Sequence, residues 1–306
     1  MTDHPISTAA LAGLVALGAA TVAFASPYSD INAAAASSQI ITRHVRGNVS
    51  MLDGSGGEIT VLSGPDGILL VDAGIAVSQR KIEAALHAIN PGKLRYVVLT
   101  HWHWDHSDGD GWVRRAGASI IADKHTVQRL SQTLRIVEWE HTFQPVPQAA
   151  LPNVVLTGDK TMRFAGETVR IRHYRPSHTD GDLSVYFEKA DVLSTGDTFW
   201  NGVYPFIDYV TGGSIDGAIS AANANLALAK PTTLVVPGHG PLGDRDQLVA
   251  FRDMLVAIRG KVADLKAKGL TADQVVAAKP TAAYDAKWGH SVISGALFTR
   301  LVYRGV

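Results

Sequence analysis

The sequence contains no cysteine among its 306 residues, although it contains 12 histidines. This absence excludes disulfide bonds, a thiolate nucleophile and every zinc site that depends on cysteine ligands. A metal site in this chain must therefore be built from histidine, aspartate or glutamate side chains.

The sequence also lacks an excess of charge of either sign, because 28 Lys and Arg residues balance 28 Asp and Glu residues. We therefore expect no nucleic-acid partner and favour a small-molecule substrate. The hydrophobic content of 46% and charged content of 18% indicate a globular chain with a sizeable core. No coiled-coil heptads are evident, so the sequence leaves the oligomeric state open.

Long apolar runs are missing except at the N-terminus, where residues 9–25 are rich in Ala and Leu. This run ends in Ala23-Phe24-Ala25, a small-x-small pattern typical of a signal-peptidase site, although residues 2–5 lack the usual Lys or Arg. We predict a signal peptide over 1–25, a linker over 26–38, and one domain over 39–306. The prediction implies a periplasmic or secreted protein without stable membrane insertion after cleavage, and an uncleaved anchor or a buried helix is the alternative.

Segments typical of strands and of helices alternate along the rest of the chain. Strands are expected at 40–49, 58–63, 68–71, 95–100, 119–122, 168–174, 183–187, 192–194 and 233–236. Helices are expected at 77–89, 214–228 and 247–268, and Thr271 with Gln274 makes a capping box for a short last helix. This order is typical of a layered α/β fold.

The densest group of chemistry-bearing residues follows the strand expected at 95–100, where residues 100–106 read T-H-W-H-W-D-H. In an extended chain, His101 and His103 point to the same side and can share one ion. Asp105 and His106 can bind a neighbouring ion where the backbone turns. A lone histidine is usually a packed or solvated side chain, but three histidines and an aspartate at this spacing indicate a zinc-type site.

Three later segments each add one candidate ligand near the end of an expected strand. His178 lies in the turn before the strand at 183–187, and Asp197 follows the strand at 192–194. His239 follows the strand at 233–236 and has glycine on both sides, which lets the backbone and a metal approach closely.

The motif at 101–106, followed in order by these three residues, resembles the metallo-β-lactamase superfamily, which includes glyoxalase II, lactonases and β-lactamases. The resemblance covers roughly residue 40 to the C-terminus. It implies an α/β (α+β) fold, a four-layer αββα sandwich, and two Zn²⁺ ions, with iron as the alternative metal. It further implies the ligand set: the first zinc is bound by His101, His103 and His178, the second by Asp105, His106 and His239, and Asp197 bridges the two. Asp72 resembles the buried aspartate that supports the metal loop, here residues 101–106, by hydrogen bonding.

The activity that this resemblance implies is hydrolysis. A hydroxide shared by two zinc ions would attack the carbonyl of an ester, thioester, lactone or amide in a small molecule. Asp105 would orient this nucleophile or move a proton. β-Lactam hydrolysis is the main alternative, and the carboxylate at position 197 weakens it because classical β-lactamases have none there. An iron-dependent persulfide dioxygenase and a non-catalytic periplasmic metal-binding protein are more remote alternatives.

Aromatic residues are concentrated in 199–209, and we take Trp200, Tyr204 and Phe206 as candidates for the substrate pocket, with burial in the core as the alternative. Trp102 and Trp104 alternate out of phase with the metal-binding histidines, so we expect them to pack beneath the metal loop. The other histidines lack such a context, and we expect ordinary surface or core roles for His4, His44, His87, His125, His141, His173 and His290.

Overall fold

The computed structural model of this chain describes Met1 and residues 26–306, so the predicted signal peptide, apart from Met1, lies outside the described residues. Two large mixed sheets form the centre of the fold. The first sheet has the order β1 (Ile41–Arg46), β2 (Val49–Asp53), β3 (Ile59–Gly64), β4 (Gly67–Val71), β5 (Leu94–Val98), β6 (Ser119–Asp123) and β9 (Val154–Leu156). The second has the order β10 (Lys160–Phe164), β11 (Glu167–His173), β12 (Leu183–Phe187), β13 (Val192–Ser194), β14 (Leu234–Val236) and β15 (Gly243–Asp244).

The apolar pattern of the central strands explains why the sheets stack. In β4, Leu69 and Val71 face a core that β11 and β12 share, whereas Ile68 and Leu70 face a second core on the other side of the sheet. Side chains alternate along a strand, so a continuous apolar run buries both faces of its sheet. One face therefore packs on the second sheet and the other face packs on helices.

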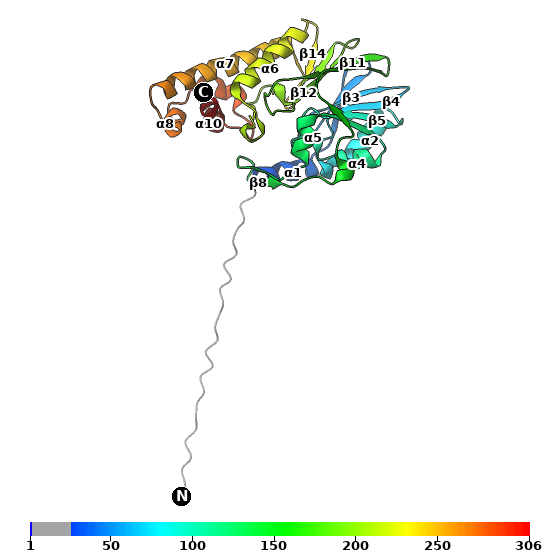
Figure 1. Cartoon of the computed structure of the whole chain (residues 1–306), viewed down its shortest axis with the longest axis horizontal. Helices are drawn as coiled ribbons and strands as arrows, with labels where there is room; N and C mark the ends of the chain where they lie inside the picture. Colours follow the sequence, from blue (N-terminus) through cyan, green and yellow to red (C-terminus); the bar gives the residue numbers. More distant parts are fainter. Residues whose placement is uncertain (2–25) are drawn as a thin grey trace.

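Helices cover the outer faces of both sheets (Figure 1). The helices on the first sheet are α2 (Gln79–Ile89), α4 (Asp110–Arg115) and α5 (Lys124–Leu130). Those beside the second sheet are α6 (Ile215–Leu228), α7 (Arg245–Ala267) and α10 (Gly295–Gly305), where α7 contacts β14 and β15 and the other two pack against it. This layering confirms the predicted α/β sandwich.

Residues 26–38 were expected to form a linker, but most of them form helix α1 (Pro27–Ser37). Ser26 caps the helix by accepting a hydrogen bond from the backbone N–H of Ser29, and proline occupies the first helical position, where it is well tolerated. Lys81 donates to the carbonyls of Ala35 and Ala36 at the other end. The alanines that resembled a linker are strong helix formers once both ends are held.

Several shorter elements were not predicted from the sequence. The expected strand at 40–49 is two strands, β1 and β2, joined at the left-handed Gly47. A small hairpin, β7 (Leu134–Ile136) and β8 (His141–Phe143), stands apart from the two sheets. The predicted capping box does begin α8 (Ala272–Ala277), but α9 (Ala282–Trp288) and α10 follow it.

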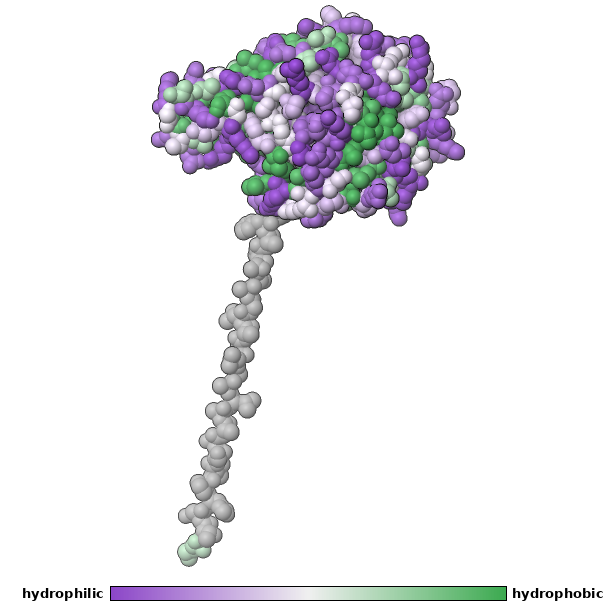
Figure 2. All heavy atoms as spheres, viewed as in Figure 1, coloured by the Kyte–Doolittle hydropathy of each residue, from purple (hydrophilic) through white to green (hydrophobic). Residues whose placement is uncertain are grey.

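Hydrophilic side chains cover much of the face seen in Figure 2, with smaller apolar patches between them. Among the described residues, no helix is both long and apolar enough to cross a membrane.

Candidate metal centre

All seven predicted metal ligands lie at one edge of the sandwich, each just beyond the end of a strand or in a turn beside it. His101 and His103 follow β5, and Asp105 and His106 lie in the short helix α3 (Trp104–Ser107). The remaining ligands are in the loop between β11 and β12 (His178), after β13 (Asp197) and after β14 (His239). Sheet topology therefore brings together residues that are up to 138 positions apart (239 − 101).

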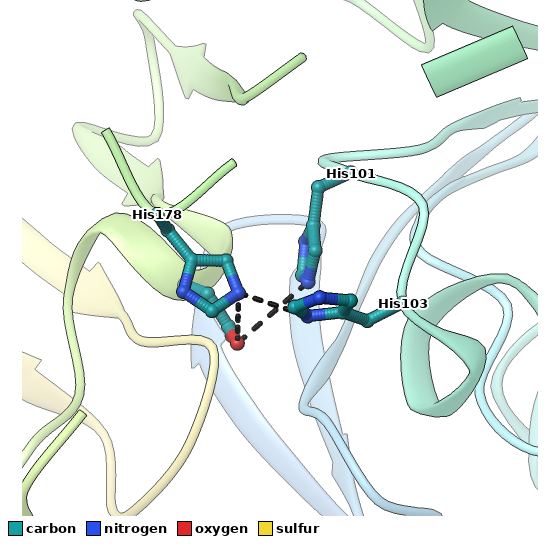
Figure 3. Close-up of side chains that lie close together, drawn as sticks. His101, His103 and His178 are labelled. Carbon is teal, nitrogen blue, oxygen red and sulfur yellow. Dashed lines mark hydrogen bonds and ion pairs between the residues drawn. The ribbon is translucent and has the colours of Figure 1, made fainter. Parts of the chain in front are cut away.

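The seven side chains form two groups whose potential ligand atoms lie within 4.8 Å of one another in each group. The first consists of His101, His103, His178 and Asp197, and the second of Asp105, His106 and His239. Figure 3 shows the three imidazoles of the first group pointing toward a common centre. Six of the seven residues are buried, and the side chain of His239 is 20% exposed, so the centre opens on the side of the second group.

Asp197 lies between the two groups, and its two oxygens face different groups. Its Oδ2 is 3.1 Å from His178 Nε2 and 3.7 Å from His101 Nε2, both in the first group. Its Oδ1 is 3.1 Å from His106 Nε2 and 3.5 Å from His239 Nε2, both in the second. A carboxylate in this position is able to serve two ions at once.

Four of the five histidines are held by one ring nitrogen and direct the other toward the centre. His101 Nδ1 lies 3.0 Å from Thr100 Oγ1, and His178 Nδ1 lies 2.9 Å from the Phe206 carbonyl. His106 Nδ1 and His103 Nε2 each face a carboxylate, as described below. Such outer partners fix the orientation and tautomer of a metal-binding imidazole.

Asp72 supports the metal loop through three hydrogen bonds. Its carboxylate accepts from the backbone N–H and hydroxyl of Thr100, at 2.7 and 2.8 Å, and its Oδ2 lies 2.8 Å from His106 Nδ1. Asp72 has a φ of 67°, a left-handed conformation that is strained for a residue with a side chain. Asp72 directly follows β4, and the strain at this residue fits a positioning role.

Asp208 is a buried neighbour of the centre that the sequence analysis missed. Its Oδ2 lies 3.0 Å from His103 Nε2, and its Oδ1 accepts from the backbone N–H groups of Val210 and Thr211. The available signal was an aspartate shortly after Asp197 in an otherwise apolar, aromatic segment.

The unpaired atoms of the centre fit a divalent cation. His101 Nε2 and Asp197 Oδ1 are buried without a hydrogen-bond partner, and His178 Nε2 faces His103 Nδ1 at 2.9 Å. Burial holds the pKa of His101 well below its usual value, which favours the neutral, ligating imidazole. Burial by itself would raise the pKa of Asp197, but the surrounding imidazoles hold it well below its usual value, so this side chain is a carboxylate. Neutral imidazoles and carboxylates are the donor set that zinc accepts.

Glycines allow the close packing of this centre. A Cβ on Gly238 would lie 2.0 Å from Asp197 Oδ1, and a Cβ on Gly57 would lie 2.2 Å from the ring of His106. Neither position can carry a side chain unless a ligand moves. The close approach at Gly238 is thus to the Asp197 carboxylate, and the expected approach of backbone and metal beside His239 stays a prediction.

A cavity of about 320 Å³ opens beside the centre, and its walls are mainly apolar. Its lining includes Asp105, Asp197 and His239 together with Ile31, Trp104, Trp139, Trp200, Val203, Phe206 and Val292. No Lys or Arg is among the described residues that line it. The cavity therefore suits an apolar, uncharged group next to the metal centre.

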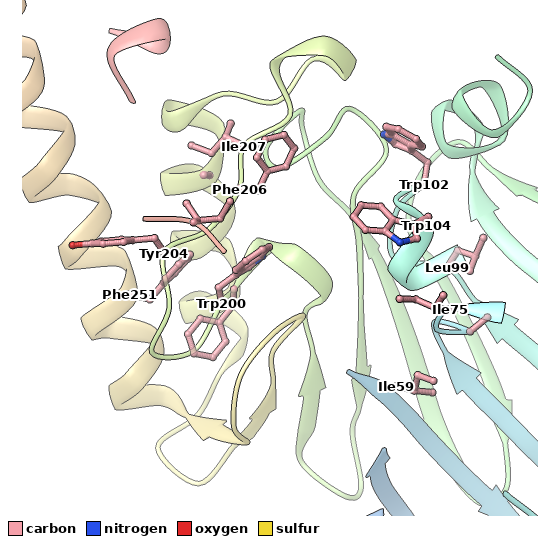
Figure 4. Close-up of a cluster of buried hydrophobic side chains, with 14 of the residues drawn as sticks. Ile59, Ile75, Leu99, Trp102, Trp104, Trp200, Tyr204, Phe206, Ile207 and Phe251 are labelled. Carbon is pink, nitrogen blue, oxygen red and sulfur yellow. The ribbon is translucent and has the colours of Figure 1, made fainter. Parts of the chain in front are cut away.

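Two of the three aromatic pocket candidates lie in this wall, and the third does not. Trp200 and Phe206 line the cavity, whereas Tyr204 is fully buried, stacks on Phe298 and donates to Asp285 Oδ1 at 2.9 Å. Tyr204 is therefore a core residue. Figure 4 shows Trp200, Tyr204 and Phe206 among the buried hydrophobic side chains of this region.

The two tryptophans of the metal loop also differ from each other. Trp102 is buried and donates to Thr211 Oγ1, as expected for a residue that packs beneath the loop. Trp104 is buried as well, but one side of it lines the cavity. The expectation for Trp104 was wrong in this respect, because a helical turn begins at residue 104 and ends the strand-like alternation.

Comparison with known proteins identifies the family. Residues 52–239, more than half of the chain, match the family model described as the metallo-beta-lactamase superfamily. The chain therefore belongs to the metallo-beta-lactamase superfamily. This membership supports a metallohydrolase role.

Individual relatives are distant. The chain is similar to a linear primary-alkylsulfatase of Pseudomonas sp. (23% identical; 71% of this chain, 48% of the relative). It is also similar to a hydroxyacylglutathione hydrolase of Anaeromyxobacter dehalogenans (29% identical; 52% of this chain, 49% of the relative). A third relative is a probable metallo-hydrolase of Bacillus subtilis (26% identical; 48% of this chain, 69% of the relative). The match thus spans about half the length of the first two of these relatives.

Solved structures show the same fold at low sequence identity. A double mutant of the sec-alkyl sulfatase PisA1 superposes with a TM-score of 0.66 at 18% identity, over 91% of this chain and 52% of that one. A metallo-beta-lactamase from Pontibacter korlensis superposes with a TM-score of 0.59 at 18% identity, over 71% of this chain and 99% of that one.

Proposed function

We propose that this protein is a dinuclear zinc hydrolase that cleaves a small ester-type bond. The observation that carries the proposal is the two groups of ligand atoms joined by the two oxygens of Asp197. His101, His103 and His178 would hold one ion, Asp105, His106 and His239 the other, and Asp197 would bridge them. Two zinc ions in these positions would polarise a carbonyl and lower the pKa of a shared water.

Asp105 is the residue best placed to act on a proton beside the ions. It lines the cavity, and its Oδ2 lies 3.2 Å from His239 Nε2. Burial by itself would raise the pKa of Asp105, but His106 and His239 lower it below its usual value, so the group is ionised and accepts hydrogen bonds. We infer that it orients the attacking water and accepts its proton.

The cavity favours a neutral substrate with an apolar acyl part. Trp104, Trp139, Trp200 and Phe206 offer ring surface, and no Lys or Arg among the described residues of the wall would pair with a carboxylate or sulfate. An anion placed there would lose hydration without gaining a salt bridge. A neutral ester or lactone therefore fits better than a charged thioester or a β-lactam with a free carboxylate.

An alkyl sulfate ester is the second candidate. Structural similarity to the sec-alkyl sulfatase extends over 91% of this chain, against 71% for the metallo-beta-lactamase. The apolar wall is suited to an alkyl chain, but the sulfate charge would have to be neutralised by the metal ions alone.

The test is a substrate panel with the zinc-loaded protein. We expect the highest kcat/KM for a neutral medium-chain aryl ester or lactone, and lower values for an acyl thioester of glutathione, a chromogenic cephalosporin and a linear alkyl sulfate. The His178→Ala variant is the control for metal dependence. Preference for the cephalosporin or the sulfate would overturn the proposed substrate class, and elemental analysis showing iron with persulfide oxidation would overturn the hydrolase proposal.

We also propose that the protein is exported after cleavage behind Ala25. Helix α1, whose cap is Ser26, would then remain intact at the new N-terminus. N-terminal sequencing of the protein from a periplasmic fraction tests this, and an intact Met1 there would contradict it.

A further inference from the structure

A second cluster of potential ligands lies outside the metal centre. Asp123 is the last residue of β6 and caps α5, His125 lies in the first turn of α5, and His173 ends β11. One ligand atom from each of these three residues lies within 4.8 Å of the others. From the sequence, both histidines are expected to have ordinary surface or core roles.

The carboxylate of Asp123 is fully buried and only half satisfied. Its Oδ1 accepts from the backbone N–H of His125 at 2.7 Å and lies 3.0 Å from the Nδ1 of that ring. Its Oδ2 is buried without a hydrogen-bond partner and lies 3.3 Å from His173 Nε2. Among residues 26–306, no Lys or Arg forms an ion pair with this carboxylate. A buried carboxylate with so little compensation is costly unless a cation is bound.

We propose that Asp123, His125 and His173 bind an additional Zn²⁺ ion, separate from the metal centre. Zinc bonds of about 2.0–2.2 Å in a tetrahedral arrangement place neighbouring ligand atoms about 3.3–3.6 Å apart. The 3.3 Å between Asp123 Oδ2 and His173 Nε2 is close to this spacing, whereas His125 Nδ1 lies 3.0 Å from the other oxygen, Oδ1, so each oxygen of Asp123 faces one of the two imidazoles. The side chains of His125 and His173 are 34% and 27% exposed, so water can reach the fourth position.

The role that follows from the position is to join the two sheets. Asp123 belongs to the first sheet and His173 to the second, so an ion between them would link strands that share no backbone hydrogen bonds. The helix that carries His125 also holds the loop of His178, because Thr126 Oγ1 donates to the Gly181 carbonyl and Arg129 pairs with Asp180. The ion would thus stabilise the wall on which one ligand of the metal centre is mounted.

Metal counting tests this site without depending on activity. The full-length protein, saturated with Zn²⁺ and dialysed, is compared by elemental analysis with the His125→Gln and His173→Gln variants, and His87→Gln, an exposed histidine on α2, is the matched control. We expect each of the two variants to lose one equivalent relative to the wild type, and the control to lose none. Because the readout is a difference of one ion against the control variant, it does not depend on the activity of the metal centre.

A melting experiment gives the second measurement. Zinc should raise the Tm of the wild type and the control more than that of either variant, since an ion that binds only the folded state stabilises it. Equal metal content in wild type and both variants would show that the cluster is only a carboxylate between two imidazoles, and would overturn the proposal.

Discussion

The carboxylate of Asp208 lies 3.0 Å from His103 Nε2, while the Nδ1 of the same ring lies 2.9 Å from His178 Nε2. Asp208 therefore fixes the imidazole of His103 through Nε2, while Nδ1 of that ring points toward the candidate metal centre. Asp208 also caps the turn at 209–211, so the position of His103 depends on the fold of the segment that forms the cavity wall.

Asp208→Asn should weaken metal binding without unfolding the protein. The amide oxygen can still accept from the backbone N–H groups of the turn, but the charge that stabilises the ligating form of His103 is lost. We expect zinc affinity at the metal centre to fall by about 10- to 100-fold, the usual effect of removing such a partner. Competition with a chromogenic chelator measures it, with Asp216→Asn on the exposed face of α6 as control. Unchanged affinity would mean that packing alone positions His103.

Gly238→Ala should disrupt the bridging position. The new methyl would lie 2.0 Å from Asp197 Oδ1 and 2.7 Å from the backbone carbon of Gly196, so the carboxylate must move. Displacements of this kind cost about 100-fold in rate, and we expect the zinc content to fall as well. Gly260→Ala is the control, because nothing lies within 4 Å of its added carbon. A Gly238→Ala enzyme with full zinc content and normal turnover would contradict the assigned position of Asp197.

Val292→Arg should change substrate preference rather than catalysis. Val292 lines the cavity and is 52% exposed, so a long cationic side chain fits there without burial. We expect kcat/KM for an anionic ester to rise about 10-fold relative to its neutral analogue, mainly through KM. Val292→Gln separates the effect of charge from that of size. If both variants behave alike, the absence of a Lys or Arg side chain from the described cavity wall does not determine the preference for a neutral ester.

Asp110→Asn should stabilise the protein at neutral and alkaline pH. Both carboxylate oxygens of Asp110 are buried without a partner, and burial, with the nearby charges of Asp72 and Asp108, raises its pKa well above the usual value. The folded state therefore keeps a proton that the unfolded state releases, so stability falls as pH rises from about 4 toward the raised pKa. Asparagine cannot ionise and should remove this loss.

Melting curves at pH 5 and pH 8 test the sign of this effect. The Tm of Asp110→Asn should exceed that of the wild type by at least about 2 °C at pH 8, and the difference should shrink at pH 5. Asp273→Asn, on an exposed carboxylate, should show no such dependence. A lower Tm at pH 8 would mean that the ionised carboxylate is stabilised by a partner, such as water.

The sequence predicts the layers and the candidate ligands because both depend on short, strong patterns. Apolar runs such as 68–71 identify buried strands directly, and the spacing of His101, His103 and His106 needs no tertiary information. To predict His239 as a ligand, it was enough to assume that the ends of neighbouring strands meet at one edge of the sheet.

The remaining features depend on tertiary contacts that no local pattern carries. Asp208 is a partner of His103 because its carboxylate lies 3.0 Å from that ring, a contact between residues far apart in the sequence. Tyr204 lies in the core because it stacks on Phe298 and donates a hydrogen bond to Asp285. His125 and His173 are 48 residues apart (173 − 125) in the sequence, and they meet because their two sheets stack.

Helix α1 adds a consequence for how the protein should be handled. Ile31 forms part of the cavity wall, and Tyr28 packs against Trp104 with ring centroids 5.2 Å apart. The family model begins only at residue 52, so a recombinant fragment trimmed to that boundary would omit this helix along with β1 and most of β2. Such a fragment could retain every candidate ligand and still give a misleading substrate profile, because one side of its binding cleft would be missing.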